Sequence, residues 1–280
     1  MTIFEPTYVA ARRVLLDALE ALAPHTSALV LAGAQAVYLH AGTGELATAP
    51  YTTDADLAVD PALLAPAPQI EAAMRKAGFN LDIRAGHTEP GIWVTTTVIN
   101  GTNVLIPVDL IVPEGFAPLG GRRGARLGTH GNQAARRAPG LEAALVDKAP
   151  MNVAALDPAD LRSFTVDVAG IAALLVAKAH KLHDRTNSTR PGRLDNKDAL
   201  DVFRLMQSGT PTTISATVAG LLAHPIAGPP TAAAITYLDE LFGRRGRAGI
   251  GMIEQASGGE LTAEHVTAVC VAFIRALQLI

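Results

Sequence analysis

Three aspartates stand close together in residues 52–60, TTDADLAVD: Asp54, Asp56 and Asp60. On an extended strand alternate side chains share a face, so the three acids would point to one side of the strand. Two explanations are open at this stage. The segment is an ordinary amphipathic strand with its polar face in water, or Asp54 and Asp56 bind a metal ion while Asp60, next to Pro61, caps the strand end.

A third acid, Asp109, favours the metal site. It stands alone in the apolar run NVLIPVDLIV (103–112), where an uncompensated charge is costly. Two carboxylates about 4 Å apart repel each other by roughly 4 kcal/mol at an effective dielectric constant near 20, so close acids require a metal ion, a shared proton or separation into water. Carboxylate ligands from neighbouring strands suit Mg²⁺ or Mn²⁺ that bridges the phosphates of a substrate.

A second group of charged residues follows in the C-terminal half. Lys178 lies in the middle of the apolar stripe of a helix predicted over residues 168–184, where a lysine is unexpected. It is either a structural lysine whose amine reaches water or a functional cation. Asp198 and Asp201 follow on a helix predicted over 195–208, where helix capping and an i, i+3 ion pair account for them structurally.

A basic segment, residues 121–137 (GRRGARLGTHGNQAARR), separates the two groups, and we expect it to be a loop or a mobile segment. It is either a solvated loop or a contact for the phosphates of an RNA acceptor, because arginine–phosphate pairing needs only charge and reach. The RNA contact is assigned to Arg122, Arg123 and Arg126; the other arginines are Arg136 and Arg137.

Strands and helices predicted from hydrophobic periodicity position these residues. The N-terminal half has an α/β pattern, and Asn100-Gly101 predicts a β-hairpin between residues 91–98 and 103–112. Residues 141–155 are interpreted as two further strands, and the pattern becomes helical from about residue 165. The remaining predictions are a strand at 27–33 and helices at 6–23, 34–40, 68–79, 168–184, 195–208, 213–223, 229–242 and 261–278.

The bulk properties are those of a soluble protein of the cytoplasm. The 280 residues are enough for two domains, which we place at 1–160 and 161–280. A net charge of −3 does not indicate nucleic acid binding by the whole surface, so such a partner requires a local basic patch. A single cysteine, Cys270, fits a reducing compartment. We expect neither a signal peptide nor a membrane span.

The order LVLAGAQAVYLHAG, TTDADLAVD and VDLIV resembles the core motif of the nucleotidyltransferase superfamily, which has a polymerase-β-like fold. The resemblance implies an α+β catalytic domain with a mixed sheet, followed by a helical C-terminal domain. It also implies that Asp54 and Asp56 are metal ligands for Mg²⁺ or Mn²⁺, with Asp109 as the third carboxylate. Gly33 and Ala34 would form the turn that faces the phosphates of a nucleoside triphosphate.

The turn departs from the family pattern, which usually has Gly-Ser or Gly-Gly where this chain has Gly33-Ala34. A missing hydroxyl removes one triphosphate contact and leaves the backbone amides. Gln35 is a candidate substitute, and Thr53 is included among the nucleotide-binding residues. Taken alone, Gly33 also fits a plain strand-to-helix turn.

The pattern K-x-x-K-L-x-x-R followed by K-D-x-x-D-V resembles a narrower group, the AbiEii/AbiGii-type toxins and the related MenT-type nucleotidyltransferases. In that group the first lysine lies on the helix after the catalytic domain. The resemblance implies that Lys178 contacts the nucleoside triphosphate, that Arg185 supports it and that Asp198 positions Lys178 or the acceptor, with Asp201 beside it.

The expected activity is metal-dependent transfer of a nucleoside monophosphate from a nucleoside triphosphate to an acceptor. By resemblance the acceptor is the 3′ end of tRNA, and the chain is the toxin of a toxin–antitoxin pair with a protein antitoxin. Two alternatives remain open. One is a nucleotidyltransferase that modifies an antibiotic or another small molecule, and the other is a catalytically silent binding protein that keeps the fold.

Overall fold

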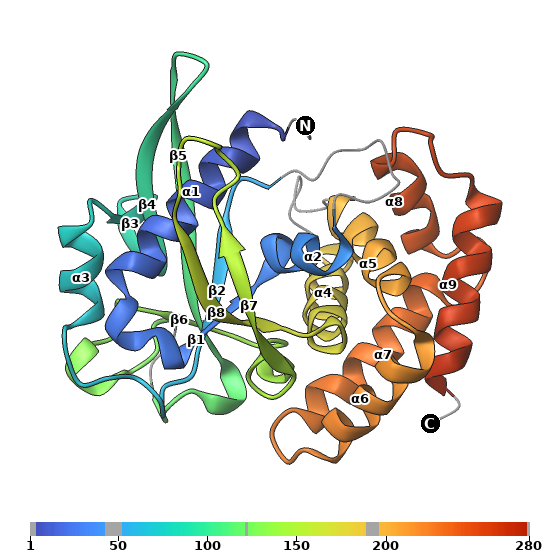
Figure 1. Cartoon of the computed structure of the whole chain (residues 1–280). Coiled ribbons are helices and arrows are strands. Elements are labelled where there is room, and N and C mark those ends of the chain that lie inside the picture. The colour runs from blue at the N-terminus through green and yellow to red at the C-terminus, as the bar shows by residue number, and fades with distance from the viewer. Residues whose placement is uncertain (1–3, 43–51, 121–122, 189–195, 279–280) are drawn as a thin grey trace. The chain divides into compact units, whose positions relative to one another are not determined.

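An eight-stranded mixed sheet is the main element of the first structural unit (Figure 1). The structure is a computed structural model that describes residues 4–42, 52–120, 123–188 and 196–278. Within these residues, one unit is formed by parts of Met1–Gln35, Pro50–Ala138 and Lys148–Val168, and the rest of the chain forms a second unit. Strands dominate the first unit and helices the second, which confirms an α+β class with a mixed sheet and C-terminal helices.

The sheet combines parallel and antiparallel neighbours in the order β3-β4-β5-β2-β1-β8-β7. Strand β2 runs antiparallel to β1 and parallel to β5, so the start of β2 lies beside the end of β1. Strand β6 pairs with β5 beyond the residues that pair with β4. The strands are β1 (Leu29–Ala32), β2 (Ala55–Val59), β3 (Asn80–Arg84), β4 (His87–Ile99), β5 (Thr102–Pro113), β6 (Arg136–Ala138), β7 (Lys148–Ala154) and β8 (Ser163–Ala169).

Strands β4 and β5 form the hairpin predicted from Asn100-Gly101. These two residues have φ angles of 50° and 79°, and the positive values are those that a type I′ turn requires. Strand β8 corrects the expectation of helices from about residue 165. Its β-branched Val166 and Val168 are buried at alternate positions, which is strand periodicity, and β8 pairs in parallel with β1.

Helix α1 (Pro6–Ala21) contacts β2, β4 and β5 with its apolar face. It begins where expected, because the Glu5 carboxylate accepts hydrogen bonds from the backbone N–H groups of Thr7 and Tyr8 and Pro6 occupies the first helical position. Helix α3 (Ile70–Lys76) is shorter than predicted and buries Ile70 and Met74. Three short 3₁₀ helices complete the first unit: η1 (Ala23–Ala28), η2 (Glu114–Phe116) and η3 (Gly128–His130).

Helix α2 (Gly33–Ala41) starts directly after β1, and most of its residues belong to the second unit. One of the two strands expected in residues 141–155 is instead the 3₁₀ helix η4 (Glu142–Leu145), and α8 was not anticipated. The helices of the second unit are α4 (Ile171–Thr186), α5 (Lys197–Gln207), α6 (Pro211–Ala223), α7 (Gly228–Phe242), α8 (Ala248–Ala256) and α9 (Ala263–Gln278).

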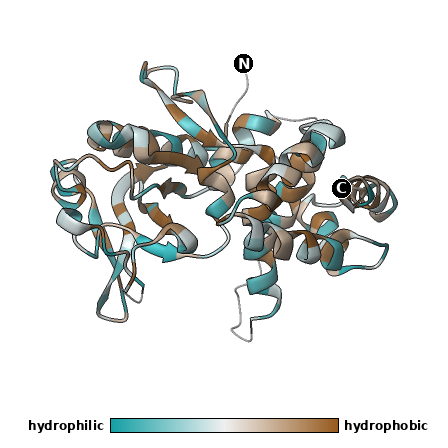
Figure 2. Ribbon diagram, turned by 90° about the horizontal axis from the view of Figure 1, so that it is seen from below, coloured by the Kyte–Doolittle hydropathy of each residue, from teal (hydrophilic) through white to brown (hydrophobic). Residues whose placement is uncertain are grey.

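Apolar residues gather inside each unit, and Figure 2 shows them as brown stretches along strands and helices. All four residues of β1 are buried, as is Trp93 in the first unit and Phe203 and Phe242 in the second. This burial holds the strands that carry the predicted site residues in a fixed register. Among the described residues, no helix is long and apolar enough to cross a membrane.

Candidate functional site

Asp56 and Asp109 lie side by side on adjacent strands. Asp56 is opposite Asp109 in the parallel pairing of β2 with β5, and it is opposite Ala32 in the antiparallel pairing of β2 with β1. Directly paired residues point to the same face of a sheet. The structure therefore brings two of the three predicted metal ligands together on one face, in a row with the last residue of β1.

Gly33 follows that last residue and lies against the Asp56 side chain. Its φ angle is +66°, in the left-handed region that favours glycine. A Cβ atom at this position would lie 2.0 Å from Asp56 Oδ2, which no real contact allows. Gly33 is thus required by the approach of this carboxylate as well as by the turn, whereas Ala34 is buried in the first turn of α2.

Asp54 is held from two sides just before β2 begins. Thr52 Oγ1 donates a hydrogen bond to Asp54 Oδ1 at 2.6 Å, and Gln35 Nε2 donates one to the Asp54 backbone oxygen at 3.0 Å. Thr52 is fully buried, whereas Thr53 is exposed. The threonine that bonds to the acid is therefore Thr52 and not Thr53, which had been chosen from the sequence.

Gln35 is fixed in turn by Arg12 of α1. Arg12 Nε donates to Gln35 Oε1 at 2.8 Å, and the other guanidinium nitrogens donate to the Ala154 backbone oxygen and to the Tyr8 hydroxyl. Burial lowers the pKa of Arg12, and the contact with Tyr8 opposes this change. A buried arginine, which sequence inspection did not single out, thus anchors the glutamine that holds the Asp54 backbone.

Asp109 bonds to an arginine in this structure. Arg136 Nε and Nη2 both donate to Asp109 Oδ2, at 3.1 and 2.8 Å, and the parallel pairing of β6 with β5 places Arg136 opposite Ile111. Burial raises the pKa of Asp109; Arg136 opposes the rise and the charge of Asp54 adds to it. Arg136 therefore supplies positive charge next to the acidic group, a role that was not anticipated.

The acids do not form a ready metal centre as they stand. Within the described ranges of the chain, no group of three or more His, Cys, Asp or Glu side chains is arranged to hold a metal ion. The donor set still fits a hard cation, because Asp56 and Asp109 present carboxylate oxygens from one row and Asp54 acts electrostatically on Asp109. To complete a three-carboxylate set, Asp109 would have to share or exchange its contact with Arg136.

The described part of the basic segment, residues 123–137, is largely a loop, as predicted, and it is packed. Ala125, Leu127, Ala134 and Ala135 are buried, and the segment contains η3 and leads into β6. The apolar residues at these positions are the sequence signal for packing. The glycines and arginines of the segment obscure this signal.

The arginines of this segment differ in their surroundings. Arg123 pairs with the buried Glu89 at 2.8 Å, and Arg137 pairs with Glu114. Arg126 is exposed and, in the part of the chain that the structure describes, has no ion-pair partner. The third residue of the predicted RNA contact, Arg122, lies outside the described residues.

Lys178 is buried in the second unit with two carboxylates. Its Nζ lies 2.7 Å from Asp198 Oδ1 and 2.7 Å from Asp201 Oδ2, and its side chain is 5% exposed. Burial alone would lower the pKa of Lys178, but the charges of Asp201 and Asp198 raise it above the ordinary value. The amine does not reach water, so the snorkelling explanation is wrong, and Asp198 accepts a hydrogen bond from Lys178.

Further cations surround the same carboxylates. Arg185 and Lys181 pair with Asp198, and Arg204 pairs with Asp201 at 3.2 Å. Burial would raise the pKa of Asp198, but the charges of Lys178, Lys181 and Arg185 lower it well below its usual range. Two cations are the more accessible members of the cluster: the Lys181 side chain is 41% exposed, and that of Arg185 is 23% exposed.

Each cluster is complete within its own unit. The first unit brings together Gly33, Asp56 and Asp109 with Asp54, and the second brings together Lys178, Arg185 and Asp198.

Comparisons with known proteins leave the identity of the chain open. No protein-family model matches it, and no curated protein matches it. A structural similarity exists to the crystal structure of JHP933 from Helicobacter pylori, with 11% sequence identity, a TM-score of 0.45 and coverage of 99% of this chain and 96% of that chain. Similarity at this level supports no inference about this protein, so function has to be argued from the site itself.

Proposed function

We propose that the chain is a metal-dependent nucleotidyltransferase with a polymerase-β-like catalytic unit. The observation that carries this proposal is the row of Asp56 and Asp109 on adjacent strands, with Gly33 pressed against the Asp56 carboxylate. Two carboxylates close together on one sheet face repel each other, and a bound cation relieves this repulsion. A glycine turn that opens a helix beside them offers backbone N–H groups to a phosphate.

In the proposed reaction the acceptor hydroxyl attacks the α-phosphorus of a nucleoside triphosphate, an O–P bond forms, and the bond to pyrophosphate breaks. Divalent ions would be held by Asp54, Asp56 and Asp109 and would neutralise charge on the phosphates. Asp109, whose pKa is raised by burial, is suited to accept the proton of the hydroxyl. Thr52, Gln35 and Arg12 hold Asp54 in place.

The resemblance of the motifs predicts that Lys178 contacts the triphosphate, but the surroundings of Lys178 do not favour this contact. A lysine enclosed by two carboxylates is not open to a triphosphate, so its direct contact with nucleotide stays a prediction that requires the cluster to rearrange. The exposed cations Lys181 and Arg185 are better placed to meet phosphate charge within the second unit. A tRNA acceptor, a toxin role and a protein antitoxin remain part of the proposal through the resemblance of the motifs.

Two observations favour a catalytically silent binding protein as the second candidate. Arg136 neutralises Asp109, and the turn carries Ala34 in place of serine or a second glycine. A protein that had lost its metal would keep such an internal cation. The two candidates differ in whether Mn²⁺ and nucleotide bind to the three-aspartate group.

The test combines binding and transfer. Calorimetry with Mn²⁺ is expected to show binding to the wild type and none to Asp56→Asn, because the central ligand is lost. Transfer of label from the four nucleoside triphosphates, tested one at a time, to total RNA is expected in the wild type and should be lost in Asp56→Asn. Asp60→Asn is the matched control, since Asp60 Oδ1 accepts a hydrogen bond from Ala62 N as a cap, a role that asparagine keeps. Equal Mn²⁺ affinity in wild type and Asp56→Asn would refute the metal site.

A further inference from the structure

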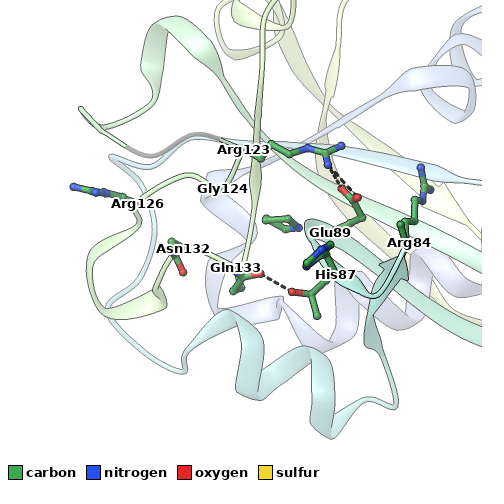
Figure 3. A pocket seen from close by; sticks show the side chains of 11 residues that line it. Arg84, His87, Glu89, Arg123, Gly124, Arg126, Asn132 and Gln133 are labelled. Carbon is green, nitrogen blue, oxygen red and sulfur yellow. Dashed lines mark hydrogen bonds and ion pairs between the residues drawn. The ribbon is translucent and has the colours of Figure 1, made fainter. Parts of the chain in front are cut away.

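A basic pocket of about 730 Å³ lies in the first unit, between the β3–β4 turn and the segment 123–133 (Figure 3). Its charged lining residues are Arg84, Arg123, Arg126 and Glu89, so the formal charge of the lining is +2 with His87 neutral. The net charge of the whole chain is −3, so this pocket is a local exception. A site of this sign selects anionic ligands.

A β-bridge connects the pocket with the acidic row. Gly124, which lines the pocket, forms this bridge with Arg136, and Arg136 bonds to Asp109. A ligand that passes Gly124 would therefore approach Arg136 and the predicted catalytic carboxylate that it bonds.

Two of the three arginines are available to a ligand. Arg123 bonds to the buried Glu89, and dashed lines mark this pair in Figure 3. The Arg84 side chain is 63% exposed, and it forms an ion pair with Asp82, two positions earlier on the same strand. Such a surface pair is worth little in water and exchanges readily for a phosphate. Arg126, the second available arginine, is also exposed.

The remaining lining indicates what kind of anion fits. Thr88, Asn132 and Gln133 offer hydroxyl and amide groups, and the described lining contains no Phe, Tyr or Trp on which a base could stack. Separated arginines with polar groups between them match phosphates spaced along a chain better than one compact phosphate group.

We infer that this pocket binds the phosphodiester backbone of a single-stranded RNA acceptor and leads its 3′ end toward Asp109. The inference rests on the proposed nucleotidyl transfer, because only that reaction needs an acceptor beside Asp109. It assigns to Arg84 and Arg126 the contact that had been placed on Arg122, Arg123 and Arg126. Binding through phosphates predicts the same affinity for different base sequences.

The experiment measures binding of fluorescently labelled 12-nucleotide oligouridylate and oligoadenylate without divalent metal, across a range of salt concentrations. The test variant is Arg84→Gln with Arg126→Gln, since both side chains are exposed and neither leaves a buried carboxylate unpaired. Arg123 is left in place because Glu89 depends on it. Arg75→Gln is the matched control, an exposed arginine of α3 that pairs with Glu71 and lies outside the pocket.

The two lost phosphate contacts are expected to lower the slope of log affinity against log salt by about 1.4, or about 25-fold in affinity near 0.1 M salt. The Arg75→Gln control should change neither value. Wild-type affinity and slope in the double variant would overturn the inference. Displacement of RNA by ATP, lost in the same variant, would also overturn it, because the pocket would then be the triphosphate site.

The design separates this inference from the proposed function. RNA binding without metal does not depend on transfer, so Asp56→Asn should bind RNA like the wild type. If the wild type transfers no nucleotide but the double variant still loses RNA binding, the transferase proposal fails and the pocket stands as an RNA site. If transfer occurs and the variant Arg84→Gln with Arg126→Gln binds RNA like the wild type, only the assignment of the pocket is refuted.

Discussion

Replacing Lys178 with Met removes the cation that bonds both Asp198 and Asp201 in the second unit. The change keeps the length of the side chain and deletes its charge. Lys178 is 5% exposed, and the two carboxylates are 3% and 0% exposed, so water cannot replace the lost amine. By sequence pattern alone, this substitution on an apolar stripe would be neutral or stabilising; the structure reverses that expectation.

The expected magnitude follows from the partners that stay behind. Removing one member of a buried ion pair costs about 3–5 kcal/mol. Asp198 keeps Lys181 and Arg185, and Asp201 keeps Arg204, so we expect the lower end of that range. The free energy of unfolding should fall by about 3 kcal/mol, measured by urea unfolding with circular dichroism at neutral pH.

Two further variants show whether the buried charge is the cause. Lys181→Met deletes the same charge from an exposed lysine that also pairs with Asp198, and it should lower stability by less than about 1 kcal/mol. Lys178→Met leaves the Asp201 carboxylate with less positive charge around it. Adding Asp201→Asn removes that carboxylate charge, so the double variant should regain part of the stability lost in Lys178→Met. Stability of Lys178→Met equal to or above the wild type would refute this reasoning.

The pH dependence has a defined sign. The pKa of Asp198 is lowered in the folded state, so its contribution is present above its unfolded pKa of about 4 and is lost as the pH falls through the lowered value. The pKa of Lys178 is raised, so its contribution is present below about pH 10 and is lost as the pH rises through the raised value. The stability difference between wild type and Lys178→Met should therefore be constant from about pH 5 to 9.

Three other changes test the first unit and the C-terminal helices. Gly33→Ala should lower the melting temperature much more than Gly86→Ala, because both glycines have positive φ angles but only at Gly33 would the added Cβ lie 2.0 Å from a carboxylate oxygen; equal losses would contradict this. Arg136→Gln should raise Mn²⁺ affinity about tenfold by calorimetry, since it frees Asp109 from a competing cation; unchanged or weaker binding would mean that Arg136 positions the carboxylate instead. Cys270 is buried and its pKa is raised to about 12, so native protein at pH 8 should resist alkylation and react only on unfolding, which mass spectrometry measures.

Local patterns were sufficient for the strands that carry the acids. The apolar run of β1, the alternation in β2 and the Asn100-Gly101 turn each encode their structure within a few residues. Asp56 and Asp109 could be predicted as neighbours because both interrupt runs with strand periodicity. Their register could not be predicted, since it depends on the pairing of strands that are distant in the sequence.

The partners of the charged residues were much less accessible to prediction. Arg136 lies 27 positions after Asp109 in a segment without clear periodicity. The two side chains meet because β6 pairs with the last residues of β5, beyond those that pair with β4. The choice between Thr52 and Thr53 depends on where β2 begins, which alternation cannot locate. Burial of Lys178 was indicated by its place on the apolar stripe, and the i, i+3 spacing of the two aspartates on α5 was the signal for its partners.

The row of Ala32, Asp56 and Asp109 joins parts of the chain that are 24 and 53 positions apart. The hairpin of β4 and β5 is local, and it contains Asp109 without Asp56. A chain that has folded only this hairpin has one carboxylate of the pair, and a one-residue slip of β2 would turn Asp56 to the opposite face. The two acids meet only when β2 has paired with β5, so any ligand that needs both of them reports on this long-range pairing.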